Sequence, residues 1–110
     1  MSASPESVAR VKELLKQLWT QHRETVFERL AIVERASSQA LELDESSMAE
    51  ARSAAHKLAG ALGTFGFQQG TEWAREAERI LERGALTEAD RARLIENAKG
   101  IRSLIETQDA

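Results

Sequence analysis

The chain has 110 residues, enough for one modest hydrophobic core and too few for two, so we expect a single domain over residues 1–110. It has no cysteine, which excludes disulfide bonds and thiolate metal sites. A formal net charge of −3, with Lys and Arg scattered among Glu, argues against nucleic acid as a partner.

The sequence also argues against a membrane protein. No apolar run approaches the roughly 20 residues that span a bilayer, and the first residues lack a basic-then-apolar signal. We therefore expect a cytoplasmic protein without membrane contact, and we take a monomer as its expected state. A single proline and an abundance of Ala, Leu, Glu and Arg favour an all-α fold.

The first predicted helical segment begins at Pro5, which suits the first helical position after a capping Ser4. Apolar residues then recur at steps of three and four, forming one stripe: Val8, Val11, Leu14, Leu15, Leu18 and Trp19. Polar residues at 20–24 interrupt this stripe before it resumes through residues 26–36. The pattern fits one long bent helix or two helices, and we expect its N-terminal part to cover one end of a bundle.

The second predicted helix follows a connector at residues 41–45. Ser47 and Glu50 have the spacing of a capping box, in which each side chain bonds the backbone of the other. The apolar residues that follow are spaced 3, 4, 3 and 4, which is the seam of a bundle helix: Met48, Ala51, Ala55, Leu58 and Leu62. We expect this helix to end within residues 63–66, which include two glycines.

Two further amphipathic helices are predicted. One covers about residues 68–83 and stops at Gly84, and Thr87 then caps the last helix with Asp90 at the capping-box position. Their apolar stripes are Trp73, Ala74, Ala77, Ile80 and Leu81 in the first, and Leu94, Ala98, Ile101, Leu104 and Ile105 in the second. The predicted fold is all-α: an antiparallel four-helix bundle with an additional N-terminal helix or helical extension.

His56 lies on the flank of the second predicted helix, about 120° from the centre of its apolar seam. Arg52, Ala59, Gly60 and Gly63 fall within about 60° of it and form its predicted strip of surface. A glycine inside a helix costs about 0.5–1 kcal/mol relative to alanine. Two glycines beside one histidine therefore suggest close approach of another backbone or another protein, although an ordinary boundary histidine at a helix end is the plain alternative.

The segments 55–60 (AHKLAG) and 63–67 (GTFGF) closely resemble the signature of histidine-containing phosphotransfer (HPt) domains, including the phosphorylated domain of chemotaxis histidine kinases. The resemblance covers about residues 47–83. It implies that His56 is the phosphoacceptor and that the partners are a response-regulator receiver domain, a histidine kinase or both. It also implies no cofactor on this chain, with Mg²⁺ held by the partner receiver.

The same resemblance assigns roles to neighbouring residues. A glutamate on the following helix holds the second ring nitrogen in the chemotaxis kinases, and this position falls on Glu78. Many members place a lysine near the phosphate, three residues after the histidine, and this chain has Ala59 there instead. Arg52 is the better placed remaining cation and Lys57 the weaker one. Ala59, together with Gly60 and Gly63, would form the docking surface for the partner.

Two rival functions are compatible with the sequence. A non-catalytic helical adaptor could bind a receiver with a vestigial His56, and a hydrolytic enzyme could use His56 with Glu78, although no Ser or Cys nucleophile is placed with them. No P-loop or glycine-rich kinase loop is present, so we expect a phosphoryl carrier without ATP-dependent kinase activity.

Overall fold

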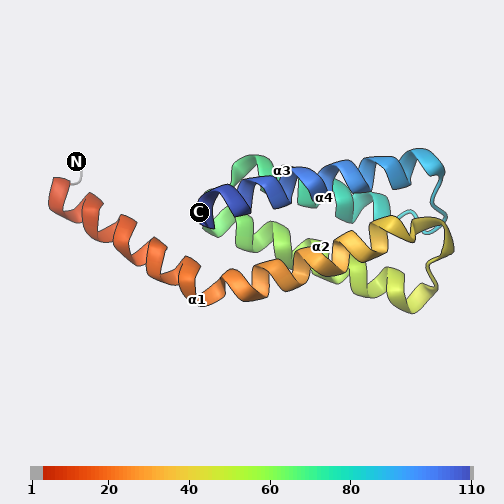
Figure 1. Cartoon of the computed structure of the whole chain (residues 1–110), viewed down its shortest axis with the longest axis horizontal. Helices are drawn as coiled ribbons and strands as arrows, with labels where there is room; N and C mark the ends of the chain where they lie inside the picture. Colours follow the sequence, from red (N-terminus) through yellow and green to blue (C-terminus); the bar gives the residue numbers. More distant parts are fainter. Residues whose placement is uncertain (1–3, 110) are drawn as a thin grey trace.

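The protein is a bundle of four antiparallel α-helices, as its computed structural model shows for residues 4–109 (Figure 1). The first three residues and Ala110 of the predicted domain lie outside the described residues. The elements in chain order are α1 (Pro5–Ser38), a short 3₁₀ helix η1 (Ala40–Glu42), α2 (Glu45–Thr64), α3 (Gln68–Leu81) and α4 (Glu88–Asp109). The predicted all-α fold is confirmed. None of the described helices is long and apolar enough to cross a lipid bilayer.

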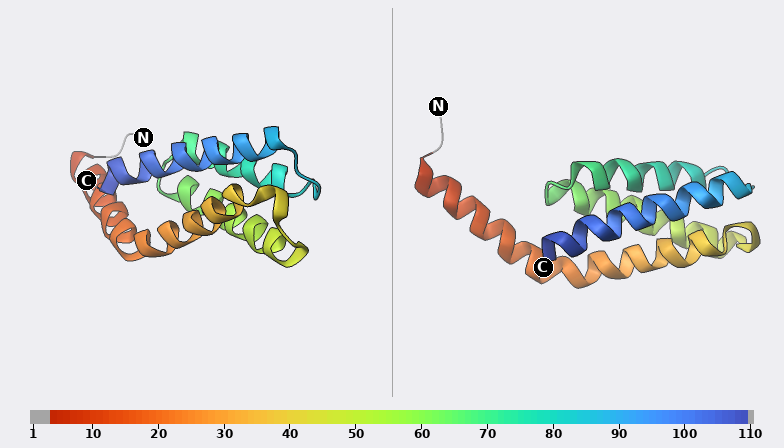
Figure 2. Two further views of the ribbon diagram at one scale, coloured as in Figure 1. Left: turned by 45° about the vertical axis from the view of Figure 1, so that its right-hand side comes forward. Right: turned by 45° about the horizontal axis from the view of Figure 1, so that its top comes forward.

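The first segment is one continuous helix of 34 residues that bends near its middle. Its C-terminal half packs in the bundle, whereas its N-terminal half projects beyond the other helices, as Figure 1 and the right-hand view of Figure 2 show. Near the bend, the Thr20 hydroxyl donates a hydrogen bond to the Lys16 carbonyl at 3.0 Å, an interaction that favours helix bending. The predicted helical extension is therefore confirmed.

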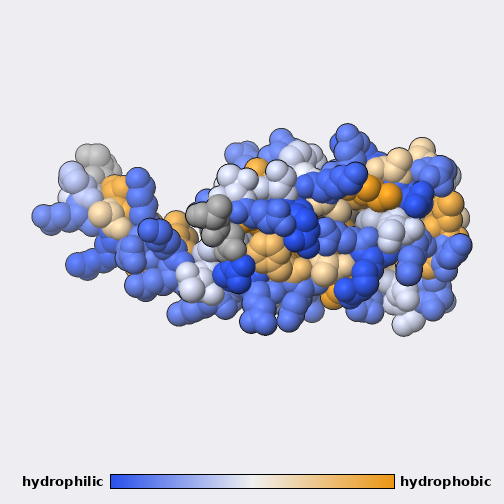
Figure 3. Space-filling model, viewed as in Figure 1, coloured by the Kyte–Doolittle hydropathy of each residue, from blue (hydrophilic) through white to orange (hydrophobic). Residues whose placement is uncertain are grey.

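The expectation that the N-terminal part covers one end of the bundle is wrong. Trp19 is the first buried side chain of α1, at 7% exposure. Apolar side chains nearer the N-terminus are 39–55% exposed and leave apolar patches among charged residues (Figure 3): Val8, Val11, Leu14, Leu15 and Leu18. The three- and four-residue spacing correctly predicts a helix here, but it does not determine whether another element covers the stripe.

The start of α2 also differs from the prediction. Asp44 is the N-cap residue, and its Oδ1 accepts a hydrogen bond from the Ser47 backbone N–H at 2.7 Å. The same bond holds the pKa of the Asp44 carboxyl below its ordinary value. Helix α2 therefore begins at Glu45, and the predicted capping box of Ser47 with Glu50 is wrong because both residues already lie inside the helix. The predicted C-terminal end is confirmed, since α2 ends at Thr64.

The core runs along the seams that the sequence predicts. Met48, Ala51, Ala55, Leu58 and Leu62 of α2 are all buried, and they pack on buried apolar residues of the other three helices: Val26, Leu30, Val33, Ala74, Ala77, Ile80, Leu81, Leu94, Ala98, Ile101 and Ile105. This packing holds α2 against α3 along their length, and α2 carries His56 on its outer side. The site is therefore built on rigid helices rather than on a loop.

An aromatic cluster fixes the turn between α2 and α3. The ring of Trp19 meets Phe65 edge to face at a centroid distance of 5.3 Å and lies 5.6 Å from Phe67. Gly66 between the two phenylalanines has φ +80°, a left-handed conformation that disfavours side chains with a Cβ. The turn sets the register of α2 against α3, and this register brings His56 opposite Glu78.

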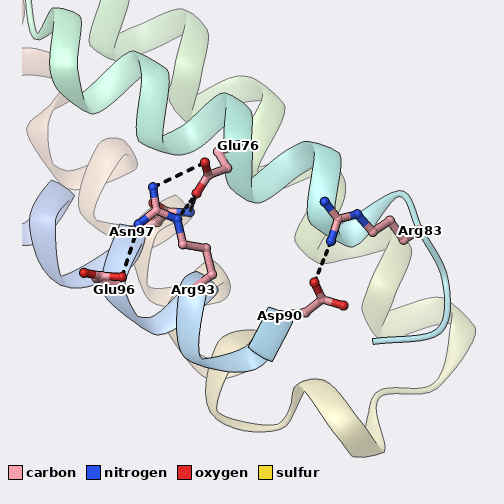
Figure 4. A network of polar contacts seen from close by, with 6 residues as sticks. All are labelled: Glu76, Arg83, Asp90, Arg93, Glu96 and Asn97. Carbon is pink, nitrogen blue, oxygen red and sulfur yellow. Dashed lines mark hydrogen bonds and ion pairs between the residues drawn. The ribbon is translucent and has the colours of Figure 1, made fainter. Parts of the chain in front are cut away.

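Polar contacts hold α4 in place. The backbone N–H of Thr87 donates to Asp90 at 3.0 Å and the Asp90 N–H donates to the Thr87 hydroxyl at 3.1 Å, so the predicted cap of α4 is confirmed. On the side of α3 that faces α4, Glu76 accepts hydrogen bonds from Arg93 and from Asn97. Arg83, which follows α3, pairs with Asp90 (Figure 4). These contacts occupy the α4-facing side of α3 and leave its α2-facing edge for the site.

Candidate functional site

His56 stands on the exposed side of α2, with 74% of its side chain accessible to solvent. Its neighbours Ala55 and Leu58 are fully buried, so the backbone that carries the imidazole is anchored in the core. The helical repeat turns His56 away from that core by more than a quarter turn. The ring is therefore held in position by the bundle and is open to another molecule.

Glu78 of α3 lies beside the imidazole. Its Oε2 is 2.9 Å from the Nδ1 of His56. An ionised carboxylate can only accept, so the hydrogen of this bond sits on Nδ1. The other ring nitrogen, Nε2, then has its lone pair free in the neutral ring. Ala77 and Leu81, on either side of Glu78 in the helix, are buried, which directs the half-buried carboxylate along the edge of α3 towards α2.

A bare strip of helix continues from His56 along α2. Gly60, one turn away, is exposed, and a Cβ on it would meet no atom within 4 Å other than its own helix backbone and chain neighbours. Gly63 is also exposed, and a Cβ there would lie 3.6 Å from the Thr71 hydroxyl. Neither glycine is required by packing within the described chain.

The expected surface position of Ala59 is wrong. Its side chain is only 5% exposed, and its carbonyl accepts a 3.4 Å hydrogen bond from the buried Thr71 hydroxyl. Ala59 faces α3 and contributes to the contact between α2 and α3. The exposed part of the predicted docking strip consists of Gly60 and Gly63.

The imidazole lines a shallow hollow of about 360 Å³ between α2 and α3. Besides His56 and Glu78, the hollow is lined by Ala59, Gly60, Arg75, Arg79 and Glu82. Sequence reasoning did not select Arg75 or Arg79. Arg75 and Arg79 are four residues apart and therefore lie on one side of α3, but the sequence does not show that this side borders His56 until the register of the two helices is known.

The two cations that the sequence singled out do not line this hollow. Arg52 is half-buried one turn before His56, and Lys57 is exposed on the neighbouring part of α2. The arrangement thus offers an open imidazole nitrogen, a carboxylate that fixes the ring, and two guanidinium groups from α3.

Among the side chains that the structure describes, no group of three or more histidine, cysteine, aspartate or glutamate residues could hold a metal ion. His22, the second histidine, lies 6.4 Å from the Phe65 ring, near the turn that follows α2. His56, by contrast, presents an exposed imidazole on a helix anchored in the core.

Comparison with known proteins agrees with this arrangement. No curated protein and no solved structure gives a significant match to the chain. The Hpt domain family matches residues 17–109, which include the bundle, His56 and Glu78 but leave out most of the projecting half of α1. The chain therefore belongs to the Hpt domain family, whose members serve as histidine phosphotransfer domains in phosphorelays with receiver domains and histidine kinases.

Proposed function

We propose that His56 is the phosphoacceptor of this Hpt domain and that it exchanges a phosphoryl group with the aspartyl phosphate of a receiver domain. The observation that carries the proposal is the pairing of a 74% exposed imidazole with a carboxylate 2.9 Å from its Nδ1. One nitrogen is thereby held and the other is free, which is the arrangement a nucleophilic histidine requires.

The transfer step needs little chemistry from this chain. The Nε2 lone pair of neutral His56 forms a bond to phosphorus while the bond between phosphorus and the aspartyl oxygen breaks, and its electron pair leaves with the carboxylate. The hydrogen stays on Nδ1, so the ring gains a positive charge as the P–N bond forms. Glu78 at 2.9 Å stabilises that charge. The reverse step returns the phosphoryl group to the receiver.

No general base is needed on this chain, because neutral imidazole already has a free lone pair. Phosphoryl transfer depends mainly on in-line positioning and charge stabilisation. A rigid helix supplies the position of Nε2, and Mg²⁺ on the receiver would neutralise charge on the phosphoryl oxygens of the aspartyl phosphate. The chain acts as a carrier between partners and not as an ATP-dependent kinase.

The partner would approach over the exposed strip of Gly60 and Gly63. An in-line transfer brings the receiver's aspartate to within a few ångströms of Nε2, so the surface of the receiver must come close to the backbone of α2. Large side chains one and two turns from His56 would obstruct that approach. The two glycines leave this backbone accessible.

The test is phosphorylation of the purified chain, with mapping of the modified residue. A panel of receiver domains phosphorylated in the presence of Mg²⁺ is mixed with the wild type, with His56→Gln and, as a matched control, with His22→Gln. We expect acid-labile phosphate on the wild type and on His22→Gln and none on His56→Gln. Equal labelling of wild type and His56→Gln would overturn the assignment of His56.

The same experiment addresses the adaptor alternative. If no receiver and no small phosphodonor such as phosphoramidate labels the wild type, while a receiver still binds His56→Gln with unchanged affinity, the chain is a non-catalytic adaptor. Labelling of His56 by phosphoramidate but by no receiver would show that His56 can be phosphorylated and that none of the tested receivers is its partner.

A further inference from the structure

The hollow beside His56 contains two arginines that the proposed function does not use. Arg75 and Arg79 line it together with His56 and Glu78, and both are exposed. Neither makes an ion pair or hydrogen bond with another residue of the described chain, although Glu78 lies on the same helix and Glu82 directly follows it.

This lack of partners contrasts with the other arginines around α3 and α4. Arg83 pairs with Asp90, Arg93 with Glu76 and Glu96, and Arg102 with Glu34 and Glu106 (Figure 4 shows the first two). Arginine side chains near a carboxylate are readily held in such pairs. Two guanidinium groups that have no partner among the described residues line the hollow beside the exposed imidazole of His56, and they point to an anion that is not part of this chain.

The register of α2 and α3 favours Arg75 over Arg79. Thr71 meets the carbonyl of Ala59 and Glu78 meets His56, so Arg75 lies between these two contacts along α3, and it lines the same hollow as His56 and Gly60. By helical position Arg75 is about 60° from Glu78 and Arg79 about 100°, further from α2. The charge of Arg79 also acts on Glu76, where it adds to the larger effects of Arg93 and Asn97 that lower the pKa of that carboxyl.

We propose that Arg75 is a positioning and stabilising residue for phosphorylated His56, its guanidinium binding the phosphoryl oxygens, with Arg79 as the weaker second cation. This inference rests on His56 being the phosphoacceptor. A guanidinium matches two oxygens of a phosphoryl group at once and stays charged at every relevant pH. Gly60 leaves room for it above α2.

The contact has a definite kinetic consequence. In the loose transition state of P–N bond cleavage, negative charge moves from the phosphoryl oxygens towards the leaving nitrogen. A cation bound to those oxygens therefore stabilises the phosphohistidine more than the transition state for its hydrolysis. Arg75 should lengthen the lifetime of the phosphorylated form and shift its equilibrium with an aspartyl phosphate towards histidine.

The test compares lifetimes of the phosphohistidine in variants of the full chain. Each protein is labelled with phosphoramidate, freed of the donor and followed by ³¹P NMR at neutral pH. We expect Arg75→Gln to shorten the half-life about two- to fivefold, which is the range for one exposed charge contact. Arg75→Lys should recover part of the loss, and Arg79→Gln should have a smaller effect. Arg10→Gln, the same change on the projecting half of α1, should have none.

The dependence of the half-life on salt concentration distinguishes a charge contact from a purely structural role of Arg75. Added salt should shorten the half-life of the wild type towards that of Arg75→Gln and should change the variant much less. Equal half-lives for wild type and Arg75→Gln would overturn the inference, as would an equal or larger effect of Arg52→Gln or Lys57→Gln. Absence of label on His56 in the wild type would instead contradict the proposed function.

Discussion

The indole ring of Trp73 on α3 lies against the backbone of Gly100 on α4. A Cβ on residue 100 would come within 2.7 Å of the ring carbon Cζ3, closer than atoms can pack. This glycine is thus required by the contact between two helices of the bundle. Gly60 is different, since no atom outside its own helix backbone and chain neighbours lies within 4 Å of its Cβ position. Replacement by alanine is therefore expected to lower the stability of the protein at Gly100 and to raise it at Gly60.

Gly100→Ala should destabilise the protein. The added methyl group forces the Trp73 ring to move, and overpacking of this kind costs about 1–3 kcal/mol, more than the roughly 0.5–1 kcal/mol that alanine gains in helix propensity. Urea unfolding followed by circular dichroism measures the difference. In a Trp73→Leu background the cost should largely vanish, and an unchanged cost there would show that the ring is not its cause.

Gly60→Ala should stabilise the protein. Alanine reduces the freedom of the unfolded chain and meets no obstacle in the folded one, so we expect a gain of about 0.5–1 kcal/mol. Thermal unfolding should show a rise in the midpoint of a few degrees, about 2–6 °C. A loss of stability would mean that residue 60 is more crowded in solution than the structure shows.

A large side chain at the same position tests the docking surface. Gly60→Trp should leave labelling of His56 by phosphoramidate within about twofold of wild type, because a small donor reaches Nε2 without contacting α2 one turn away. Transfer from a phosphorylated receiver should fall at least tenfold, about 1.4 kcal/mol in the barrier, because the receiver can no longer approach. Equal loss with both donors would indicate damage to the histidine itself and contradict a docking role for Gly60.

Glu78→Gln should slow phosphoryl transfer to His56 while preserving the fold. The amide can still accept from Nδ1, but it lacks the negative charge that stabilises the ring as the P–N bond forms, so we expect a rate reduced about tenfold or more. Glu78→Ala should be slower still, because the ring loses its orientation as well. Single-turnover transfer from a phosphorylated receiver measures both, and a wild-type rate in Glu78→Ala would exclude a role for this carboxylate.

Acid stability should depend on Glu76. Arg93, Asn97 and, more weakly, Arg79 hold the pKa of this carboxyl below its ordinary value of 4.5. The unfolded chain therefore binds more protons than the folded one in this range, and the free energy of unfolding rises with pH. The contribution is complete above about pH 4.5 and is lost as the pH falls through the folded-state pKa.

Glu76→Gln should remove this part of the pH dependence and cost about 1–2 kcal/mol at pH 7, where wild-type Glu76 accepts charge-assisted hydrogen bonds. Urea unfolding at pH 3 to 7 measures both effects. Glu72→Gln, an exposed glutamate of the same helix without an ion-pair partner among the described residues, is the control and should keep the wild-type slope. A wild-type slope in Glu76→Gln would exclude this carboxyl as its source.

Much of the site could be predicted from the sequence, because helical periodicity relates residues within one helix reliably. The seam through Ala55 and Leu58 fixes the direction of His56, and the stripe through Ala77 and Leu81 puts Glu78 at the edge of its helix. The short turn between these helices makes them antiparallel neighbours. The family resemblance singles out Glu78 as the partner of His56, and these local features are compatible with their meeting.

Other features depend on which surfaces meet, and periodicity does not contain that information. The apolar stripe from Val8 to Leu18 has the same three- and four-residue spacing as the buried stripes, yet its side chains are exposed. Ala59 falls on the same helical strip as Gly60, yet α3 buries one and leaves the other open.

The sequence by itself determined the helices, their apolar faces, the family signature and the orientation of His56, because each depends on residues close together in the chain. Only the tertiary structure decided that half of α1 projects from the bundle, that Ala59 is covered, and that Arg75 of α3 faces the hollow beside His56. These depend on the packing register between helices, which is set by many side chains from distant parts of the chain acting together.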